Sequence, residues 1–258
     1  MKISVKFAAR EVNMQIIPAI DIRKGKCVRL IMGDVRDETI YSKEPVEMAK
    51  LWQIKGGRMI HVVDLDGALT GRAKNIDIIL KIIKSLRVNV QVGGGIRSEE
   101  IIKRYLKAGA KRVILSTSVI SDVDFFDAVL EKYKNEIVVG VDAKDGFVAA
   151  KGWKDITKIK ALDFIRELEE KGVKRIVYTD INRDGVLKGP NIKGITAVLK
   201  NTQMKVIVSG GITRMKNLER LAELNKKYGN IEGIIIGKAL YTGKIDLKEA
   251  VSTLREIK

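Results

Sequence analysis

The amino-acid sequence predicts an α/β fold, namely a single (β/α)8 barrel of the TIM type with a pseudo-twofold half-barrel repeat. Three observations indicate it. The chain has 258 residues, which suits one such barrel. Short β-branched runs alternate with helical patterns, at about thirty residues per unit. Several motifs of the first half of the chain return in the second half.

Eight strands are expected where apolar and β-branched residues run together. Near-continuous apolar runs are typical of parallel strands that are buried on both faces. No Pro- or Ser-rich linker separates the eight units, which favours a closed barrel over an open sheet. The predicted strands are residues 15–20, 59–64, 88–93, 111–116, 137–142, 174–179, 204–209 and 231–237.

The intervening segments carry apolar residues at helical spacing. One stripe comprises Ile76, Ile79, Leu80 and Ile83. Others begin at Leu218 and at Leu247, and Asp246 with Glu249 has the spacing of a capping box before the last helix. A helix is also expected to begin near Thr157, which leaves a loop of about fourteen residues after the fifth strand, longer than a plain connection requires.

The internal repeat supports one domain rather than two. Residues 91–97 (QVGGGIR) are echoed by residues 207–213 (IVSGGIT), 116 positions later. Asp21 after the first predicted strand matches Asp142 after the fifth, and Asn75 matches Asn191. We therefore expect a single barrel domain over residues 14–258, preceded by an N-terminal extension over residues 1–13.

Composition excludes several classes of protein. The single cysteine, Cys27, allows no internal disulfide, and no apolar run is long enough to span a membrane. The net charge of +17 is spread along the whole chain without interleaved aromatic residues, which favours a solvated surface over a nucleic-acid interface. We expect a cytoplasmic monomer that binds neither membrane nor nucleic acid.

Two carboxylic acids are the candidate catalytic pair. In (β/α)8 barrels the site lies at the C-terminal ends of the strands, where Asp21 and Asp142 are expected to face each other. General acid–base catalysis needs one protonated and one ionised group, which unequal surroundings can provide. The alternative is that each aspartate only caps a turn. We expect no metal site, because the chain has one histidine, His61, and the acids are not clustered; His61 either orients a catalytic carboxylate or simply packs.

Glycine-rich loops at two places predict two phosphate sites. Glycines at strand ends that lead into helices expose backbone N–H groups, which bind phosphate together with the helix dipole. The duplication implies a substrate with two phosphates, held on opposite sides of one mouth. The residues expected at the first site are Gly94, Gly95, Thr117 and Ser118, and those at the second are Gly210, Gly211, Gly237 and Lys238.

The sequence also resembles one family, the phosphoribosylformimino-aminoimidazole-carboxamide ribotide isomerases of histidine biosynthesis. The resemblance runs from about Met14 to the C-terminus, and residues 1–13 have no counterpart, whether they form an added strand or follow from an upstream start codon. The motifs that carry it are Ile17-Pro-Ala-Ile-Asp21, Gly25-Lys-Cys-Val-Arg29, His61-Val-Val-Asp-Leu-Asp-Gly67, Val92-Gly-Gly-Gly-Ile-Arg97, Gly140-Val-Asp-Ala-Lys144, Lys151-Gly-Trp153, Tyr178-Thr-Asp-Ile181, Arg183-Asp-Gly185 and Gly233-Ile-Ile-Ile-Gly-Lys-Ala-Leu-Tyr241.

This resemblance implies an Amadori rearrangement of a bisphosphorylated ribotide, an aldose–ketose isomerisation that needs no cofactor. It implies that Asp21 is the base and Asp142 the acid. Trp153 would stack on the imidazole of the substrate, in a loop that closes over it, or pack against the barrel rim. The further substrate-binding residues are expected to be Arg29 and Arg97 close to the substrate or its phosphates, Thr179 and Asp184 near the sugar ring, and also Gly185 and Asp64, the latter at the end of the second strand.

Three alternatives remain open at this point. The sister cyclase barrel of imidazole-glycerol-phosphate synthase shares the symmetry and the paired aspartates, but resembles the chain less at residues 18–21, 151–153 and 189–191. A dual-substrate isomerase that also acts on phosphoribosylanthranilate would look much like this chain. A ribotide- or RNA-binding protein without enzymatic activity could use the positive charge, although the two retained acids argue against it.

Overall fold

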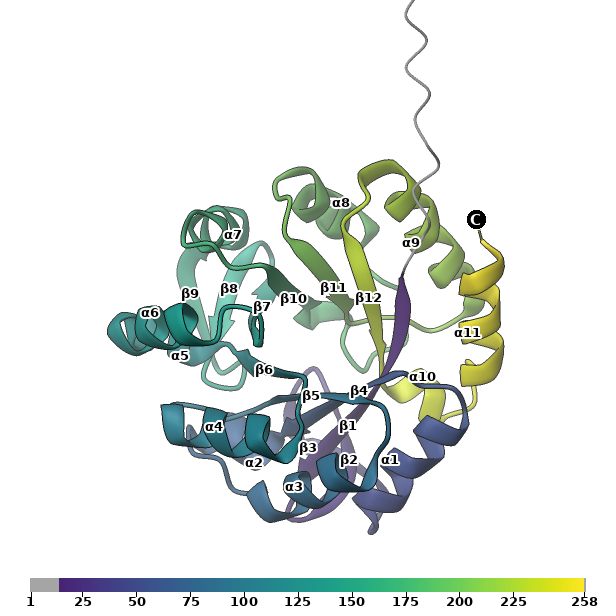
Figure 1. Ribbon diagram of the computed structural model, residues 1–258. Coiled ribbons are helices and arrows are strands. Elements are labelled where there is room, and N and C mark those ends of the chain that lie inside the picture. Colours follow the sequence, from purple (N-terminus) through teal and green to yellow (C-terminus); the bar gives the residue numbers. More distant parts are fainter. Residues whose placement is uncertain (1–13, 258) are drawn as a thin grey trace, which may run out of the picture.

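The computed structural model describes residues 14–257, and the predicted extension over residues 1–13 lies outside them. Within the described part, eight parallel strands close into a barrel, because the last pairing joins β7 to β10 (Figure 1). The barrel strands are β1 (Gln15–Arg23), β4 (Met59–Asp64), β5 (Asn89–Gly93), β6 (Arg112–Leu115), β7 (Ile137–Lys144), β10 (Arg175–Asp180), β11 (Lys205–Ser209) and β12 (Ile231–Ile236). All eight predicted strands are thus confirmed.

Helices surround the barrel on its outside (Figure 1). The predicted apolar stripes form their buried faces, as in α9, where Leu218, Leu221 and Ala222 are fully buried. Asp246 caps the last helix, since its side chain accepts hydrogen bonds from the N–H groups of Lys248 and Glu249. The outer helices are α1 (Pro45–Ile54), α3 (Ile76–Ser85), α4 (Glu99–Ala108), α6 (Val123–Lys132), α7 (Ala161–Glu170), α8 (Ile192–Lys200), α9 (Met215–Tyr228) and α11 (Leu247–Glu256).

Short elements follow several strands at the C-terminal mouth of the barrel. They form the loops that shape the site, because each lies between a strand end and the next outer helix. These elements are α2 (Leu65–Thr70), α5 (Thr117–Ser121), α10 (Lys238–Tyr241) and the 3-10 helix η1 (Ile181–Arg183).

Two β-hairpins, which were not predicted from the sequence, extend strands of the barrel beyond its rim. β1 continues into β2 (Lys26–Ile31) and β3 (Asp34–Ser42), and β7 continues into β8 (Phe147–Ala150) and β9 (Asp155–Lys160). Asp21 and Asp142 consequently lie inside strands rather than after them. The expected helix start near Thr157 is wrong, because that residue pairs within the second hairpin and α7 begins at Ala161.

The interior of the barrel is a small apolar cluster that lies beneath the mouth. Its members come from seven of the strands, so the barrel centre is filled by side chains, as in other (β/α)8 barrels. The cluster consists of Ile17, Ala19, Met59, Ile114, Val138, Val177, Ile207 and Ile235. A second, larger apolar core fills the space between strands and outer helices.

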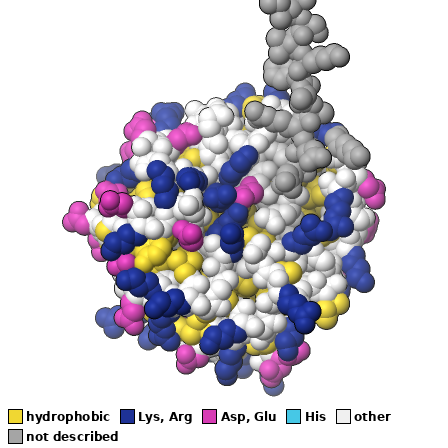
Figure 2. Space-filling view, in the orientation of Figure 1, with side chains coloured by type: hydrophobic (Ala, Val, Ile, Leu, Met, Phe, Trp, Pro, Cys, Tyr) yellow, Lys and Arg dark blue, Asp and Glu magenta, His cyan; other side chains and the backbone are white. Residues whose placement is uncertain are grey.

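The outer surface carries the positive charge in dispersed form. Figure 2 shows Lys and Arg spread over the visible face, with Asp and Glu between them. This distribution matches the expected solvated surface on the face shown. No helix within residues 14–257 is long and apolar enough to cross a membrane.

Candidate active site

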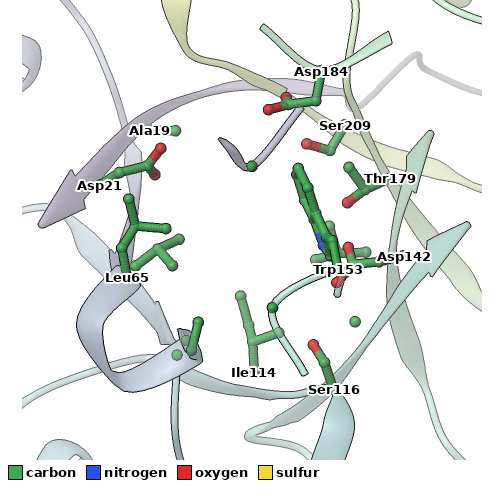
Figure 3. A pocket seen from close by; sticks show the side chains of 18 of the residues that line it. Ala19, Asp21, Leu65, Ile114, Ser116, Asp142, Trp153, Thr179, Asp184 and Ser209 are labelled. Atoms are coloured by element: carbon green, nitrogen blue, oxygen red, sulfur yellow. The ribbon is translucent and has the colours of Figure 1, made fainter. Parts of the chain in front are cut away.

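A cavity opens at the C-terminal ends of the barrel strands (Figure 3). Every residue that the sequence predicted for catalysis or substrate binding lines it, with the exception of Asp64. Asp21 and Asp142 lie on opposite sides, and the indole ring of Trp153 projects into the space between them. The two-sided arrangement predicted from the repeat is therefore present.

Asp64, which the sequence predicted to contact substrate, does not line the cavity and is bonded within the protein. Its side chain is fully buried and caps α2. The carboxyl group accepts hydrogen bonds from the N–H groups of Gly67 at 2.8 Å, Lys74 at 2.6 Å and Asn75 at 2.9 Å, and from the side chain of Asn75 at 2.7 Å. Both carboxyl oxygens are thus occupied by the loop that follows β4.

Asp21 is held next to a cation. The Nη1 atom of Arg29 lies 2.7 Å from Oδ2 of Asp21, and both residues are largely buried. Arg29 reaches this place from β2, and it also donates to the carbonyl oxygen of Ala19 and packs against the ring of Tyr241. Burial raises the pKa of Asp21, whereas the Arg29 guanidinium acts in the opposite direction. The ion pair favours the ionised form of Asp21.

Asp142, by contrast, forms no ion pair with any Lys or Arg within residues 14–257. Burial raises its pKa, and hydrogen bonds from the side chains of Trp153 and Thr179 partly offset the increase. Thr179 is the register partner of Asp142 on the adjacent strand β10, and Figure 3 shows the indole nitrogen of Trp153 turned toward the carboxyl group. Neutral donors stabilise a carboxylate less than a guanidinium does. Asp142 is therefore the better placed of the two to carry a proton.

A third acid, Asp184, faces the same cavity from the loop after η1. Burial raises its pKa to about 6; Arg29 and Lys238 lower it, and the charges of Asp21 and Asp142 raise it. Its carboxyl group is consequently half protonated near pH 6.

The two glycine-rich loops have closely similar geometry. Gly94 and Gly210 both adopt positive φ, of 102° and 91°, and a side chain on either would overlap the backbone oxygen of Asp64 or Asp180. Only glycine fits these positions without displacement. The adjoining short helices α5 and α10 begin at Thr117 and Lys238. Their N-cap residues, Ser116 and Gly237, make no side-chain capping hydrogen bond to the first N–H groups of these helices.

Cationic side chains lie near these loops. Arg97 and Lys238 line the cavity, and neither forms an ion pair with a described residue. Lys238 donates to the carbonyl oxygen of Gly185 at 3.0 Å. The cavity thus combines anion-binding groups at its rim with acids further inside. Within residues 14–257 no three His, Cys, Asp or Glu side chains come together as a metal site.

The turn that carries Trp153 lies over the mouth in this structure. Lys151, Gly152 and Trp153 all have positive φ, between 53° and 68°, which is unfavourable for the two residues with side chains. The N–H of Lys151 donates to Oγ1 of Thr117 at 2.9 Å, and the Trp153 ring packs on Gly33 in the β2–β3 turn. Gly33 also lines the cavity and was not predicted from the sequence. The glycine in the turn Met32-Gly33 was the available signal.

His61 lines the cavity and is bonded to a buried amide rather than to a carboxylate. Its Nδ1 lies 3.1 Å from Nε2 of Gln91. Burial, and to a smaller extent the charge of Arg29, lowers the pKa of His61 to about 3. The imidazole is neutral over the whole physiological pH range.

Comparison with known proteins connects this geometry to a family. Residues 15–246 match the family model described as "Histidine biosynthesis protein". The chain is 47% identical over 245 residues to the 1-(5-phosphoribosyl)-5-((5-phosphoribosylamino)methylideneamino) imidazole-4-carboxamide isomerase of Desulforudis audaxviator, covering 95% of this chain and 93% of the relative. It is 49% identical to the protein of the same name from Oceanobacillus iheyensis, covering 92% of this chain and 96% of that protein. It is 44% identical to the protein of the same name from Thermodesulfovibrio yellowstonii, covering 94% of this chain and 98% of that protein.

Proposed function

The chain belongs to the histidine biosynthesis protein family, and from this membership we propose that it is an aldose–ketose isomerase of histidine biosynthesis. Its substrate is the ribotide named in its relatives, which carries two phosphoribosyl groups. The enzyme converts the phosphoribosylamino group of that substrate into the phosphoribulosyl form. The observation that carries the proposal is the pair of buried acids with unequal partners, set between two anion-binding loops.

The two phosphates bind at opposite sides of the mouth. One is held by the loop of Gly94 and Gly95 and the start of α5 at Thr117, with Arg97 nearby. The other is held by the loop of Gly210 and Gly211 with Gly237 and Lys238. Backbone N–H groups at loops of this kind are suited to bind phosphate. The sugar that reacts then lies between Asp21 and Asp142.

Ring opening is the task of Asp142. Its protonated carboxyl group donates to the ring oxygen, the bond from C1 to that oxygen breaks, and the nitrogen lone pair forms a protonated Schiff base at C1. Thr179 and the indole of Trp153 stabilise the carboxylate that remains, because both donate hydrogen bonds to it. The imidazole of the substrate stacks on Trp153.

Proton removal from C2 is the task of Asp21. The Arg29 guanidinium keeps this group ionised and ready to accept the proton. Electrons from the C2–H bond form a C1–C2 double bond and neutralise the nitrogen, which gives an enolamine. Loss of the hydroxyl proton at C2 and protonation of C1 complete the ketone. C2 is oxidised and C1 reduced within one molecule, so the reaction requires no external oxidant.

The remaining parts of the proposal concern the state of the protein. We propose a cytoplasmic monomer without metal, cofactor, membrane or nucleic-acid partner. All groups assigned to the reaction come from one cavity of one chain, which supports a monomer as the functional unit.

The test is an assay of the purified protein with the ribotide that bears either deuterium or hydrogen at C2 of its phosphoribosylamino group. We expect formation of the ketose, with a slower rate for the deuterated substrate when proton removal limits turnover. Phosphoribosylanthranilate is offered separately, and turnover of both compounds would establish the dual-substrate isomerase. Consumption of the ketose in the presence of ammonia, without formation of it from the ribotide, would instead indicate the sister cyclase. Absence of any turnover would contradict the proposal.

A further inference from the structure

A row of polar side chains crosses the otherwise apolar barrel interior. His61 forms part of the cavity surface, and Gln91 next to it is fully buried. At the opposite end of the interior, Nη2 of Arg112 lies 2.7 Å from Glu232, which Arg175 contacts at 3.1 Å. This ion cluster has two guanidinium groups and one carboxylate, which gives a formal charge of +1. Gln91 lies between the histidine and the cluster.

The strand register places these side chains next to one another. His61 on β4 is the register partner of Gln91 on β5, and Gln91 is in turn the register partner of Arg112 on β6. Register partners present their side chains on the same face of the sheet. Two buried polar atoms of this pair, Oε1 of Gln91 and Nη1 of Arg112, have no hydrogen-bond partner within the described part of the chain.

The positive charge of Arg112, the register partner of Gln91, favours one orientation of the Gln91 amide. A guanidinium group only donates hydrogen bonds, so it favours the amide oxygen on its side and repels the amide NH2 group. The NH2 group then faces His61, where Nε2 of Gln91 lies 3.1 Å from Nδ1. A donor at this distance requires Nδ1 to be the acceptor. The proton of the neutral imidazole is therefore on Nε2.

We propose that His61 is a further substrate-binding residue, which donates its Nε2–H to a sugar hydroxyl oxygen of the bound ribotide, and that Gln91 positions this donor by fixing the tautomer. The substrate part of this statement rests on the proposed function. No described residue accepts a hydrogen bond from Nε2 of His61. Because the pKa of His61 is about 3, the group neither competes with Asp21 for protons nor adds positive charge beside Arg29.

The position of His61 in the barrel explains why the ligand atom is a hydroxyl oxygen. His61 is the register partner of Ala19, two residues before Asp21 on β1. Two residues along a strand correspond to about 6.6 Å, so the histidine lies one side-chain layer deeper than Asp21. The phosphate loops occupy the rim, and the uncharged oxygens of the sugar are the groups that reach this depth.

The tautomer can be measured directly, because the chain contains a single histidine. We expect ¹⁵N-histidine NMR of the whole protein to show protonation at Nε2 and no titration between pH 5 and 9. Addition of the ribotide should shift the Nε2–H resonance, whereas inorganic phosphate alone should not. Protonation at Nδ1 in the free protein would overturn the role of Gln91. An unchanged Nε2–H resonance at saturating ribotide would overturn the role of His61.

Variants separate this role from a structural one. His61→Met removes the donor and should lower kcat/KM about two- to tenfold, the usual effect of one neutral hydrogen bond. His61→Gln, whose amide nitrogen can reach a similar position, should recover part of the loss. Gln91→Glu should move the imidazole proton to Nδ1 in the NMR spectrum, whereas Gln53→Glu on the outer helix α1 should leave the spectrum unchanged. Equal kcat/KM for folded His61→Met and wild type would contradict the proposal.

If the ribotide binds and shifts the resonance without being converted, the proposed function fails while the assignment of His61 as a ligand-binding residue stands. If the ribotide is converted and the resonance does not move, the assignment of His61 fails while the proposed function stands. The two proposals can thus fail independently of each other.

Discussion

The two halves of the barrel share a backbone and differ in the side chains they present to the cavity. In the first half, Asn75 donates to Asp64 and Gly94 packs against the backbone of Asp64. In the second, Asn191 donates to Asp180 at 2.7 Å and Gly210 packs against Asp180 in the same way. All three pairs of positions are 116 residues apart. The repeated elements are those that shape the two anion-binding loops.

The hairpins show how the halves differ. Each half inserts a hairpin after its first strand, β2–β3 after β1 and β8–β9 after β7. The first hairpin brings Arg29 to Asp21, and the second brings the Trp153 indole to Asp142. A duplicated scaffold therefore carries two acids whose proton affinities are set by different partners. Under the proposed function, the symmetric part binds the two phosphates of the substrate, and the asymmetric part distinguishes base from acid.

Removing either acid should have the largest effect. We expect Asp21→Asn and Asp142→Asn each to lower kcat by about 10²–10⁴, the usual contribution of one general acid or base. Binding of the ribotide should change little, because the phosphate loops are untouched. Steady-state rates and isothermal titration with the ribotide measure the two quantities. Asp37→Asn on the exposed part of β3 is the control, and near-normal kcat in either active-site variant would refute that residue's assignment.

The fold followed from the sequence because the barrel strands are apolar and regularly spaced. The two hairpins could not be predicted in this way, because β3 and β9 contain many exposed charged residues and their sequences resemble loops. The two-residue turns Lys24-Gly25, Met32-Gly33 and Asp145-Gly146, in which both residues have positive φ, were the available signal.

The different surroundings of the three strand-end aspartates could not be predicted from the sequence either. Asp21, Asp64 and Asp142 all stand near strand ends, and sequence position alone does not separate them. What distinguishes them is the chain that folds back onto each one: a guanidinium from β2, amides from residues 74–75, or an indole from the β8–β9 turn. Such partners are far apart in sequence or come from turns that the local pattern did not reveal.

Variants of Trp153 test the second half of the comparison. Trp153→Ala should weaken ribotide binding about tenfold to a hundredfold, since stacking of a base on an aromatic ring is worth about 1–3 kcal/mol. Trp153→Phe keeps a ring but loses the indole N–H. This removes a contribution that lowers the pKa of Asp142, so the acid should remain protonated to higher pH. The alkaline limb of the pH profile of kcat should therefore shift to higher pH. A lower Tm with unchanged KM in Trp153→Ala would show that the ring only packs against the rim.

The smallest effect on turnover is expected where the halves are most alike, at Asp64 and Asp180. The two oxygens of Asp64 accept four hydrogen bonds, so an amide in Asp64→Asn must place its NH2 group against two N–H donors. We expect a loss of about 1–3 kcal/mol in the free energy of unfolding.

Asp180 accepts one hydrogen bond, through Oδ2, and its buried Oδ1 has no partner within residues 14–257. In Asp180→Asn the amide oxygen can keep the hydrogen bond from Asn191. The NH2 group then replaces Oδ1, to which no described residue donates a hydrogen bond. The free energy of unfolding should then stay within about 0.5 kcal/mol of wild type. Urea unfolding of both variants measures the difference, and kcat and KM measured alongside should remain within twofold of wild type. An Asp64→Asn protein of normal stability but raised KM would restore the substrate contact originally expected for Asp64. Equal destabilisation of the two variants would show that the symmetry of these networks extends to their energetics.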